Sequence, residues 1–476
     1  MSRLLPLLWP LVALVVLPCS PSVAQFEGFV LPGNSSSTLK PPPNIPPPQI
    51  ARWMLEHSRA RQPKPAPHKE TTDYSGLMSA MERRADYDEM ISTARKQMTS
   101  HPREGRWYLY TGQAYFWKGD LQAAIAHWNK ATILSPSLTS QTAPLRAKAL
   151  RIKRANPNLS LRPIVRVSSE AASHRTALYQ RVLPLQKARR WKDLDAVCDQ
   201  MSGVNFDGTP DNDQAVEVLS NPQDNTEAGW NAKRGLLESW VKARPQSRWA
   251  KIVLYRAWIR HAWHRRGADY APKVTQKQWS GAQSALTQAT KIASSLPNSV
   301  QTNPTFYRVT LSFMVLAGTP IEQIKAVYAQ AQRRFPTNRS LDFEMAWLLL
   351  PRWYGEPGEF QNFISTRADQ IGGEAGDIAY GQMVLSQSDH FPEQKFWQQS
   401  HLSWPRAKRG FLALLRRNPN SVSIATWLML NAQRNHDRST ARAMMIRLNN
   451  RANSSKWNNP HDFAVLRAQL LDPDSK

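Results

Sequence analysis

The sequence predicts an all-α protein in which helix-turn-helix repeats pack on an irregular α-helical repeat domain. Two segments of similar pattern end at Pro102 and Pro136, and this spacing matches the length of one helix-turn-helix repeat, roughly 34 residues. Glycine is scarce (20 residues), proline is frequent (35 residues) and long β-branched alternations are rare, so helices separated by proline-marked turns are expected. The 18 tryptophans indicate a packed structure, because disordered chains are poor in aromatic residues.

Residues 1–24 have the pattern of a signal peptide. Arg3 precedes an apolar run over residues 4–17, and Ser22-Val23-Ala24 supplies small residues before a cleavage site after Ala24. The run is shorter than the about 20 residues that a transmembrane helix needs, so we expect cleavage and no transmembrane span in the mature chain. An uncleaved anchor and lipidation at Cys19 are the alternatives, although a proline before Cys19 disfavours lipidation. The expected location is periplasmic or secreted.

One cysteine, Cys198, is left after cleavage, and a lone thiol cannot form an intramolecular disulfide. Its apolar helical position predicts buried packing, with a reactive or intermolecularly paired thiol as the alternative.

The net charge of +26 attracts anions in general: nucleic acid, acidic polymers, anionic lipid headgroups or acidic proteins. Because the basic residues are spread along the chain, no specific nucleic-acid site is expected, while peripheral contact with an envelope surface stays possible.

Residues 25–72 are expected to form a proline-rich linker. Two proline triplets favour an extended, polyproline-like spacer, and a docking site for a proline-binding module is the alternative. Helical repeats follow over residues 73–157, and a connector over residues 158–173 leads to a helical region at 174–390. Residues 404–471 are expected to form a C-terminal helical repeat whose last helix caps the stack.

The best repeat unit spans residues 105–136. Gly112 would allow two helices to approach closely, Gly119 would make the turn, and three residues share one face of the second helix: Ala124, Trp128 and Ala131. On these positions the unit resembles a tetratricopeptide repeat, and a chance helical hairpin is the alternative.

That resemblance implies a groove lined by the first helix of the repeat. The groove-facing residues would be Arg106, Leu109, Gln113, Phe116 and Trp117. They combine a cation, an amide and aromatic rings, which suits an extended peptide with an acidic end. The alternative is that neighbouring helices of the same chain fill the groove.

The Trp-rich part of the central region, residues 230–388, resembles a bacterial family of unknown function. The motifs are Arg-Pro-x-Ser at 244–247, Ala-Trp-x-x-Arg-Gly at 262–267 and Leu-Pro-Arg-Trp-x-Gly at 350–355. The resemblance fits an irregular helical-repeat domain and implies no particular activity, because none is established for that family. Before it, residues 202–226 are expected to form a polar, acidic loop.

No complete catalytic, metal-binding or phosphate-binding motif occurs in the sequence. His261 and His264 lie three residues apart on a predicted helix, but two ligands do not make a metal site. Five carboxylates of one region could serve a glycosidase, although the first two are expected at a helix N-terminus: Glu356, Glu359, Asp369, Glu374 and Asp377. We therefore expect no catalytic residues, no metal and no cofactor.

These features favour a non-enzymatic function. The expected molecule is an exported scaffold or adaptor that binds an acidic protein or peptide in the cell envelope. A second hypothesis is an envelope enzyme or a factor that binds an anionic polymer, either peptidoglycan or acidic polysaccharide. A third is nucleic-acid binding driven by charge.

Overall fold

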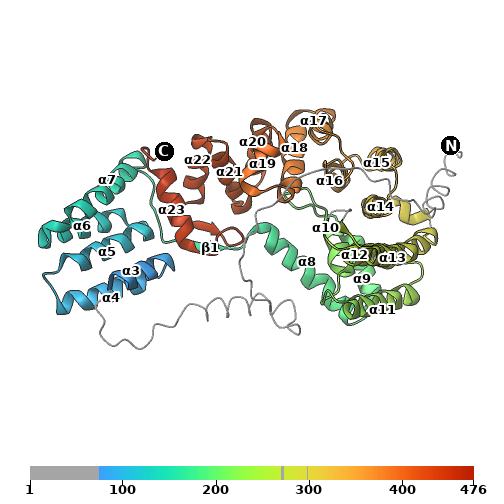
Figure 1. Ribbon diagram of the computed structural model, residues 1–476, viewed down its shortest axis with the longest axis horizontal. Coiled ribbons are helices and arrows are strands. Elements are labelled where there is room, and N and C mark those ends of the chain that lie inside the picture. The colour runs from blue at the N-terminus through green and yellow to red at the C-terminus, as the bar shows by residue number, and fades with distance from the viewer. Residues whose placement is uncertain (1–73, 270–272, 297, 476) are drawn as a thin grey trace. The chain divides into compact units, whose positions relative to one another are not determined.

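The computed structural model describes residues 74–269, 273–296 and 298–475 (Figure 1). The predicted signal peptide, its Cys19 and the proline-rich linker lie outside the described residues. Within the described ranges the chain is helical almost throughout, and the strands found there are Val165–Val167 and Arg451–Asn453. This confirms the predicted all-α fold. No helix in these ranges combines the length and apolar character that a bilayer-spanning segment needs.

The described residues form two compact units. One unit is continuous and comprises residues 177–360, whereas the other joins residues 74–176 to residues 361–475. Helices α8 (Glu170–Lys187) and α17 (Glu359–Ile371) each run from one unit into the other. The N-terminal repeats and the C-terminal helices, which the sequence presents as separate regions, thus belong to one unit.

The discontinuous unit begins with helices that pair in chain order. They are α3 (Tyr74–Arg83), α4 (Tyr87–Ser100), α5 (Gly105–Lys118), α6 (Leu121–Leu134), the 3-10 helix η2 (Pro136–Leu138) and α7 (Thr139–Ala155). Helix α6 begins one fixed interval after α4 begins and ends the same interval after α4 ends. This interval equals the spacing between Pro102 and Pro136 in the sequence, so the predicted repeat is confirmed. After α7 the chain continues as a connector that contains strand β1 (Val165–Val167), so the third repeat consists of a single helix.

Residues after 361 complete the discontinuous unit. They form α18 (Gly373–Gln387), η5 (Ser388–His390), η6 (Glu393–Lys395), α19 (Phe396–Ser400), α20 (Trp404–Arg417), α21 (Val422–Arg434), α22 (Arg438–Leu448), β2 (Arg451–Asn453) and α23 (Pro460–Leu471). Strands β1 and β2 pair in parallel. The Glu170 carboxylate accepts hydrogen bonds from the backbone N–H groups of Val422 (2.6 Å) and Ser423 (3.0 Å), at the positive end of the α21 dipole. These contacts join segments that are far apart in the sequence.

The continuous unit is built around one helix, α12. Its helices after α8 are α9 (Trp191–Gln200), α10 (Asp211–Ser220), α11 (Glu227–Ala243), α12 (Arg248–Arg266), α13 (Gln276–Ser294), η4 (Asn298–Thr302), α14 (Pro304–Leu316), α15 (Ile321–Arg334) and α16 (Arg339–Leu348). Helix α12 packs against α10, α11, α13 and α14 (Figure 1). Its buried residues lie on most sides of the helix, as expected for a helix surrounded by others.

The sequence motifs of this unit have structural roles. Ser247 caps α12 by accepting a hydrogen bond from the backbone N–H of Ala250, and both Ser247 and Arg244 bind the Asp195 carboxylate. The Arg266 guanidinium is buried and lies between 5.2 and 5.9 Å from the ring centroids of three tryptophans: Trp263, Trp279 and Trp353. The second and third motifs thus meet in space.

The prediction of a polar loop over residues 202–226 is wrong in its middle, where helix α10 forms. Helix α10 places Glu217 against three arginines of α12 and α14: Arg256 (2.9 Å), Arg308 (2.7 Å) and Arg260. Burial alone would raise the pKa of Glu217, but the three arginines hold it well below its usual range. Glu217, together with Asp213 (3.3 Å from Arg308), therefore serves as an internal counter-ion for a basic chain.

Candidate interaction surface of the tetratricopeptide-like hairpins

Helix α5 carries all five residues that the repeat resemblance places in a groove. It is fixed against α6 at Gly112, where an added Cβ atom would lie 2.5 Å from the indole ring of Trp128. Trp128 is fully buried, and its Nε1 donates a hydrogen bond to the Leu109 carbonyl at 3.2 Å. Gly119 ends α5 with a φ of 95°, a left-handed conformation that glycine adopts readily. The expected roles of Gly112 and Gly119 are thus confirmed.

Two of the five predicted groove residues belong to the hydrophobic core of the hairpins. Leu109 is 4% exposed and Phe116 is 6% exposed. The Phe116 ring lies 5.8 Å from that of Trp128 on the paired helix. Truncation of either side chain would therefore leave a cavity between α5 and α6.

The other three side chains reach the surface of α5 to different extents. Arg106 is exposed and forms an ion pair with Glu104 at 2.6 Å. Gln113 and Trp117 are half-buried. Trp117 donates from Nε1 to the Glu82 carboxylate at 2.7 Å, so its indole is held by the preceding hairpin. Binding of a peptide by these residues stays a prediction.

The C-terminal helix α23 contacts the end of α5 that carries Trp117. The His461 ring lies 5.0 Å from the Trp117 ring in an edge-on arrangement, and its Nδ1 is 2.9 Å from the Tyr87 hydroxyl. Just before α23, the Asn459 amide donates to the Arg83 carbonyl at the end of α3. The beginning of α23 is therefore held by the first two repeats.

Arg467 is a buried charged link between α23 and the repeats. It is 3% exposed and donates to the carbonyl oxygens of Trp117 (3.0 Å), Arg162 (2.9 Å) and Asn449 (3.4 Å). Burial lowers the pKa of Arg467 to about 10. The side chain thus satisfies backbone acceptors from three separate segments.

The far end of α23 is bound to α7. The Arg151 guanidinium donates two hydrogen bonds to the Asp472 carboxylate, each of 2.8 Å, and the Asn156 amide donates to the Leu471 carbonyl at 3.2 Å. Helix α23 therefore crosses the C-terminal ends of α3, α5 and α7. The sequence predicts a terminal cap here, but nothing in it indicates that the cap covers the first repeats.

A hollow of about 580 Å³ opens beside the turn between α5 and α6. Its walls come from residues 115–122, from residues 152–157 at the end of α7, and from residues 159–163 of the connector. The Lys153 ammonium reaches the Gln122 side-chain oxygen at 3.3 Å across its edge. The lining is roughly half polar, so the hollow can receive a mixed polar and apolar side chain.

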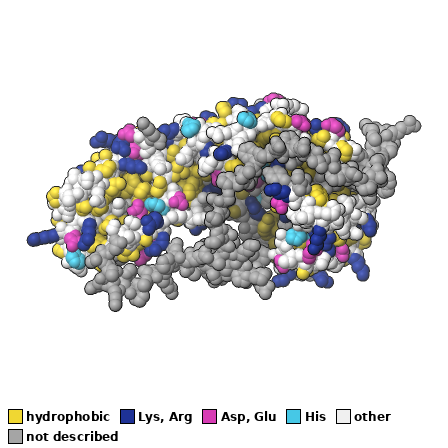
Figure 2. Space-filling view, in the orientation of Figure 1, with side chains coloured by type: hydrophobic (Ala, Val, Ile, Leu, Met, Phe, Trp, Pro, Cys, Tyr) yellow, Lys and Arg dark blue, Asp and Glu magenta, His cyan; other side chains and the backbone are white. Residues whose placement is uncertain are grey.

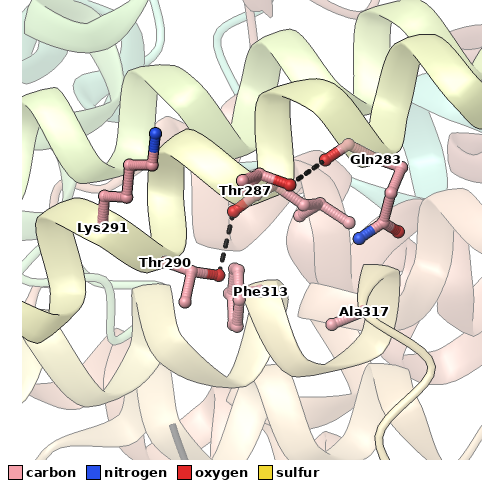
Figure 3. A pocket seen from close by; sticks show the side chains of 7 residues that line it. Gln283, Thr287, Thr290, Lys291, Phe313 and Ala317 are labelled. Atoms are coloured by element: carbon pink, nitrogen blue, oxygen red, sulfur yellow. Dashed lines mark hydrogen bonds between the residues drawn. The ribbon is translucent and has the colours of Figure 1, made fainter. Parts of the chain in front are cut away.

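A smaller hollow, of about 180 Å³, lies between α13 and α14 in the continuous unit (Figure 3). The hydroxyls of Thr287 and Thr290 face it but donate to the carbonyl oxygens of Gln283 and Leu286, each at 3.0 Å. Leu286 and Phe313 supply most of the remaining wall. The two hydroxyls are therefore already used, while Gln283 and Lys291 add an amide and a cation to the lining.

The two histidines that the sequence brings together on α12 do not form a metal site. His261 is fully buried and its Nε2 lies 3.0 Å from the Glu227 carboxylate, while Arg234 contacts its Nδ1. Burial lowers the pKa of His261 to about 4, so the ring is neutral near pH 7. The described residues contain no cluster of three or more side chains placed to hold a metal ion.

The carboxylates considered for glycosidase chemistry are engaged by cations or by a helix end. The Glu359 carboxylate lies 2.9 Å from Lys325 and accepts a hydrogen bond from the Glu356 backbone, at the start of α17. Ion pairs with Arg416 and Arg409 hold the pKa of Glu374 and of Asp377 below their usual ranges, and Asp369 pairs with Arg406. A glycosidase needs one carboxyl group with a raised pKa, and the pKa values of Glu374 and Asp377 are shifted in the opposite direction.

The remaining cysteine, Cys198, is 1% exposed on α9, which confirms the predicted burial. Burial raises the pKa of its thiol to about 12, so it carries almost no thiolate near pH 7.

Comparisons with known proteins give a limited picture. No protein-family model matches the chain, so the resemblance of residues 230–388 to a bacterial family stays a prediction. No curated protein matches it. Among solved structures, the crystal structure of yeast Tom70 is similar over 89% of this chain and 80% of the Tom70 chain, with 10% sequence identity and a TM-score of 0.29.

Proposed function

We propose that this protein is an exported helical-repeat scaffold that binds a protein or peptide of the cell envelope through the α5 face. The α5 face is the surface of helix α5 that carries Arg106, Gln113 and Trp117. The observation that carries the proposal is the pair of stacked hairpins, α3–α4 and α5–α6, whose second helices are related by one constant repeat period. Such stacked hairpins form extended surfaces that recognise other chains by shape and charge. The signal-peptide pattern of residues 1–24 supports export.

The exposure of the α5 side chains decides which of them a partner can contact. Arg106 is exposed and Gln113 is half-buried, while Trp117 is partly covered by His461 of α23. Arg106 already pairs with a carboxylate, that of Glu104, so an acidic group of a partner can replace it there. A partner with an acidic end fits this position.

The decisive experiment uses side chains that leave the core intact. The double variant Arg106→Glu with Gln113→Ala should reduce recovery of a crosslinked envelope protein, since it reverses one charge and removes one amide. Lys96→Glu, an exposed position on the second helix of the first hairpin, is the matched control. Phe116→Ala is unsuitable, because Phe116 is buried and its loss would unfold the hairpin.

Equal recovery of the same protein by the double variant and by the unaltered chain would refute the α5 site. Export is tested separately, by finding the mature chain in the envelope fraction with Gln25 as its first residue. The glycosidase alternative would need a carboxyl group other than the ion-paired set described above.

A further inference from the structure

The stretch of the chain that contains α6 and α7 is rich in cations. Residues 121–169 contain no Asp or Glu, yet they contain eight basic residues: Lys130, Arg146, Lys148, Arg151, Lys153, Arg154, Arg162 and Arg166. Among the described residues, one of the eight, Arg151, forms an ion pair with a carboxylate. The other seven cations of this stretch therefore lack a carboxylate partner within the described structure.

Exposed apolar side chains gather in the same stretch. Of the four large apolar residues that are exposed in the described structure, three lie there: Ile133 (74%), Leu150 (38%) and Val165 (46%). Figure 2 shows apolar and cationic side chains next to each other over the part of the surface formed by α5 to α7. A surface that combines unpaired cations with exposed aliphatic groups is typical of an interaction site.

Two hydrogen bonds show how α6 and α7 lie side by side. Arg146 donates to the Asn129 side-chain oxygen at 2.6 Å, and Lys153 donates to that of Gln122 at 3.3 Å, so the helices are antiparallel. Ile133 is one turn beyond Asn129 on α6, and Leu150 is one turn beyond Arg146 on α7. The two apolar side chains are therefore separated along the helices by about 12 Å, or roughly two turns.

Comparison of α7 with α5 explains why this face is open. Leu150 lies one repeat period after Phe116, and Phe116 is buried against Trp128 of the helix that follows α5. No helix follows α7 in the same way, because the chain leaves it as a connector. The third repeat thus lacks its second helix, and Leu150 is exposed where such a helix would pack.

The missing helix would have to be acidic. Gly112, which allows α6 to approach α5 closely, corresponds one repeat period later to Arg146. A helix that packs on α7 must stay farther away at this point and must face a guanidinium. Lys153 and Arg154 add two more exposed cations at the end of the same face. A carboxylate-bearing helix satisfies these groups, whereas an ordinary apolar helix would bury them unpaired.

We propose that the open face of α6 and α7 binds an acidic amphipathic helix of a partner protein, which completes the third repeat. Its apolar side chains would contact Ile133 and Leu150, and its carboxylates would pair with Arg146, Lys153 and Arg154. The exposed aliphatic groups favour a protein helix over nucleic acid or polysaccharide, which have no aliphatic surface to bury. The net charge of +26 disfavours a second copy of the chain. The site is separate from the α5 face, so each can fail without the other.

The test uses the full chain and two labelled helical peptides of about 18 residues. The acidic peptide carries two leucines two helical turns apart, flanked by glutamates on an alanine background, and the basic peptide has lysine at every glutamate position. The site variant is Arg146→Glu with Lys153→Glu and Arg154→Glu. The control variant, Lys187→Glu with Lys192→Glu and Lys242→Glu, has the same net charge and changes exposed lysines of the continuous unit. Binding is measured by fluorescence anisotropy.

The unaltered chain and the control variant should bind the acidic peptide with similar affinity, and the site variant should bind it about tenfold or more weakly. The site variant should in turn prefer the basic peptide. Leu150→Ser should weaken binding of the acidic peptide with the salt dependence unchanged, because it removes an apolar contact and no charge.

Three results would overturn the proposal. One is the absence of binding of the acidic peptide to the unaltered chain. Another is an equal loss in the site and control variants, which would show attraction by net charge alone. The third is displacement of the peptide from the unaltered chain by phosphatidylglycerol vesicles, together with loss of vesicle binding in the site variant. These two results would assign the face to a membrane surface.

Discussion

Two charged residues, the half-buried Glu217 and the buried Arg467, are satisfied in different ways. Glu217 faces three arginines, whereas Arg467 has no carboxylate and donates to three backbone carbonyl groups. Both arrangements fix segments that are distant in the sequence. Loss of one partner would leave a buried charge or acceptor unpaired, which is more destabilising than the net contribution of the interaction.

Two glycines on helices provide a matched pair for testing close packing. Gly112→Ala would place a Cβ atom 2.5 Å from the Trp128 ring, so we expect the free energy of unfolding of the discontinuous unit to fall by about 1–3 kcal/mol. Gly235, in α11, has no atom within 4 Å of the position of an added Cβ. Gly235→Ala should therefore stabilise the continuous unit by about 0.5–1 kcal/mol. Amide exchange at increasing urea concentrations gives the free energy of unfolding of each unit. Stabilisation by Gly112→Ala would contradict the packing.

The buried His261 predicts a pH dependence of stability. Its pKa is about 4 in the folded chain and 6.5 when unperturbed, so the unfolded chain binds a proton first as the pH falls. The stability due to the neutral ring is complete above the unfolded pKa and is lost as the pH falls toward the folded value, by about 3 kcal/mol in total.

His261→Gln removes this titration, so the dependence of the unfolding free energy on pH between about 6.5 and about 4 should become flatter. His101→Gln, at an exposed position, should keep the original slope. Urea unfolding, monitored by amide exchange in α12 at several pH values, gives the slope of the unfolding free energy against pH. An unchanged slope in His261→Gln would show that other groups are responsible.

At the scale of the elements, helix α23 holds together the ends of three helices from the start of the chain. It contacts the α3 end through Asn459, the α5 end through Arg467 and the α7 end through Asp472. The pattern of the sequence predicts α23 as a terminal helix but not its position, because its polar contacts are with backbone carbonyls and single side chains from the opposite end of the described chain. Helical periodicity reports which residues face a core and does not report which core.

Removal of α23 tests this role. A chain that ends at Asn458 should show faster amide exchange in α3, α5 and α7, since the backbone carbonyls of Arg83 and Trp117 lose their partners and the apolar face under Phe463 and Leu471 is uncovered. Helices α12 and α13 belong to the other unit and should exchange as before. Unchanged protection of α5 in the shortened chain would show that the repeats are stable without α23.

At the scale of the whole molecule, the repeat period and the aromatic packing could be predicted because they are local. The spacing of the repeats, Gly112 and Trp128 all act within one or two hairpins, and all are found in the structure as expected. The helix that carries Glu217 could not be predicted in the same way, because its arginine partners lie much later in the chain, on α12 and α14. Of the predicted groove residues, Leu109 and Phe116 are buried, which the family pattern alone does not indicate.

The molecule is held together by packing, hydrogen bonds and ion pairs, and its response to redox conditions can be predicted. Cys198 is buried and its thiol pKa is raised to about 12, so iodoacetamide should not modify it in the folded chain near pH 7 but should do so in denaturant. Cys198 is the one cysteine of the described residues and is free, so a reductant should leave the melting temperature unchanged. Mass spectrometry of the alkylated protein, with and without denaturant, checks the first expectation. Rapid modification of the native chain would mean that α9 opens and that the packing of Cys198 against its neighbours does not persist in solution.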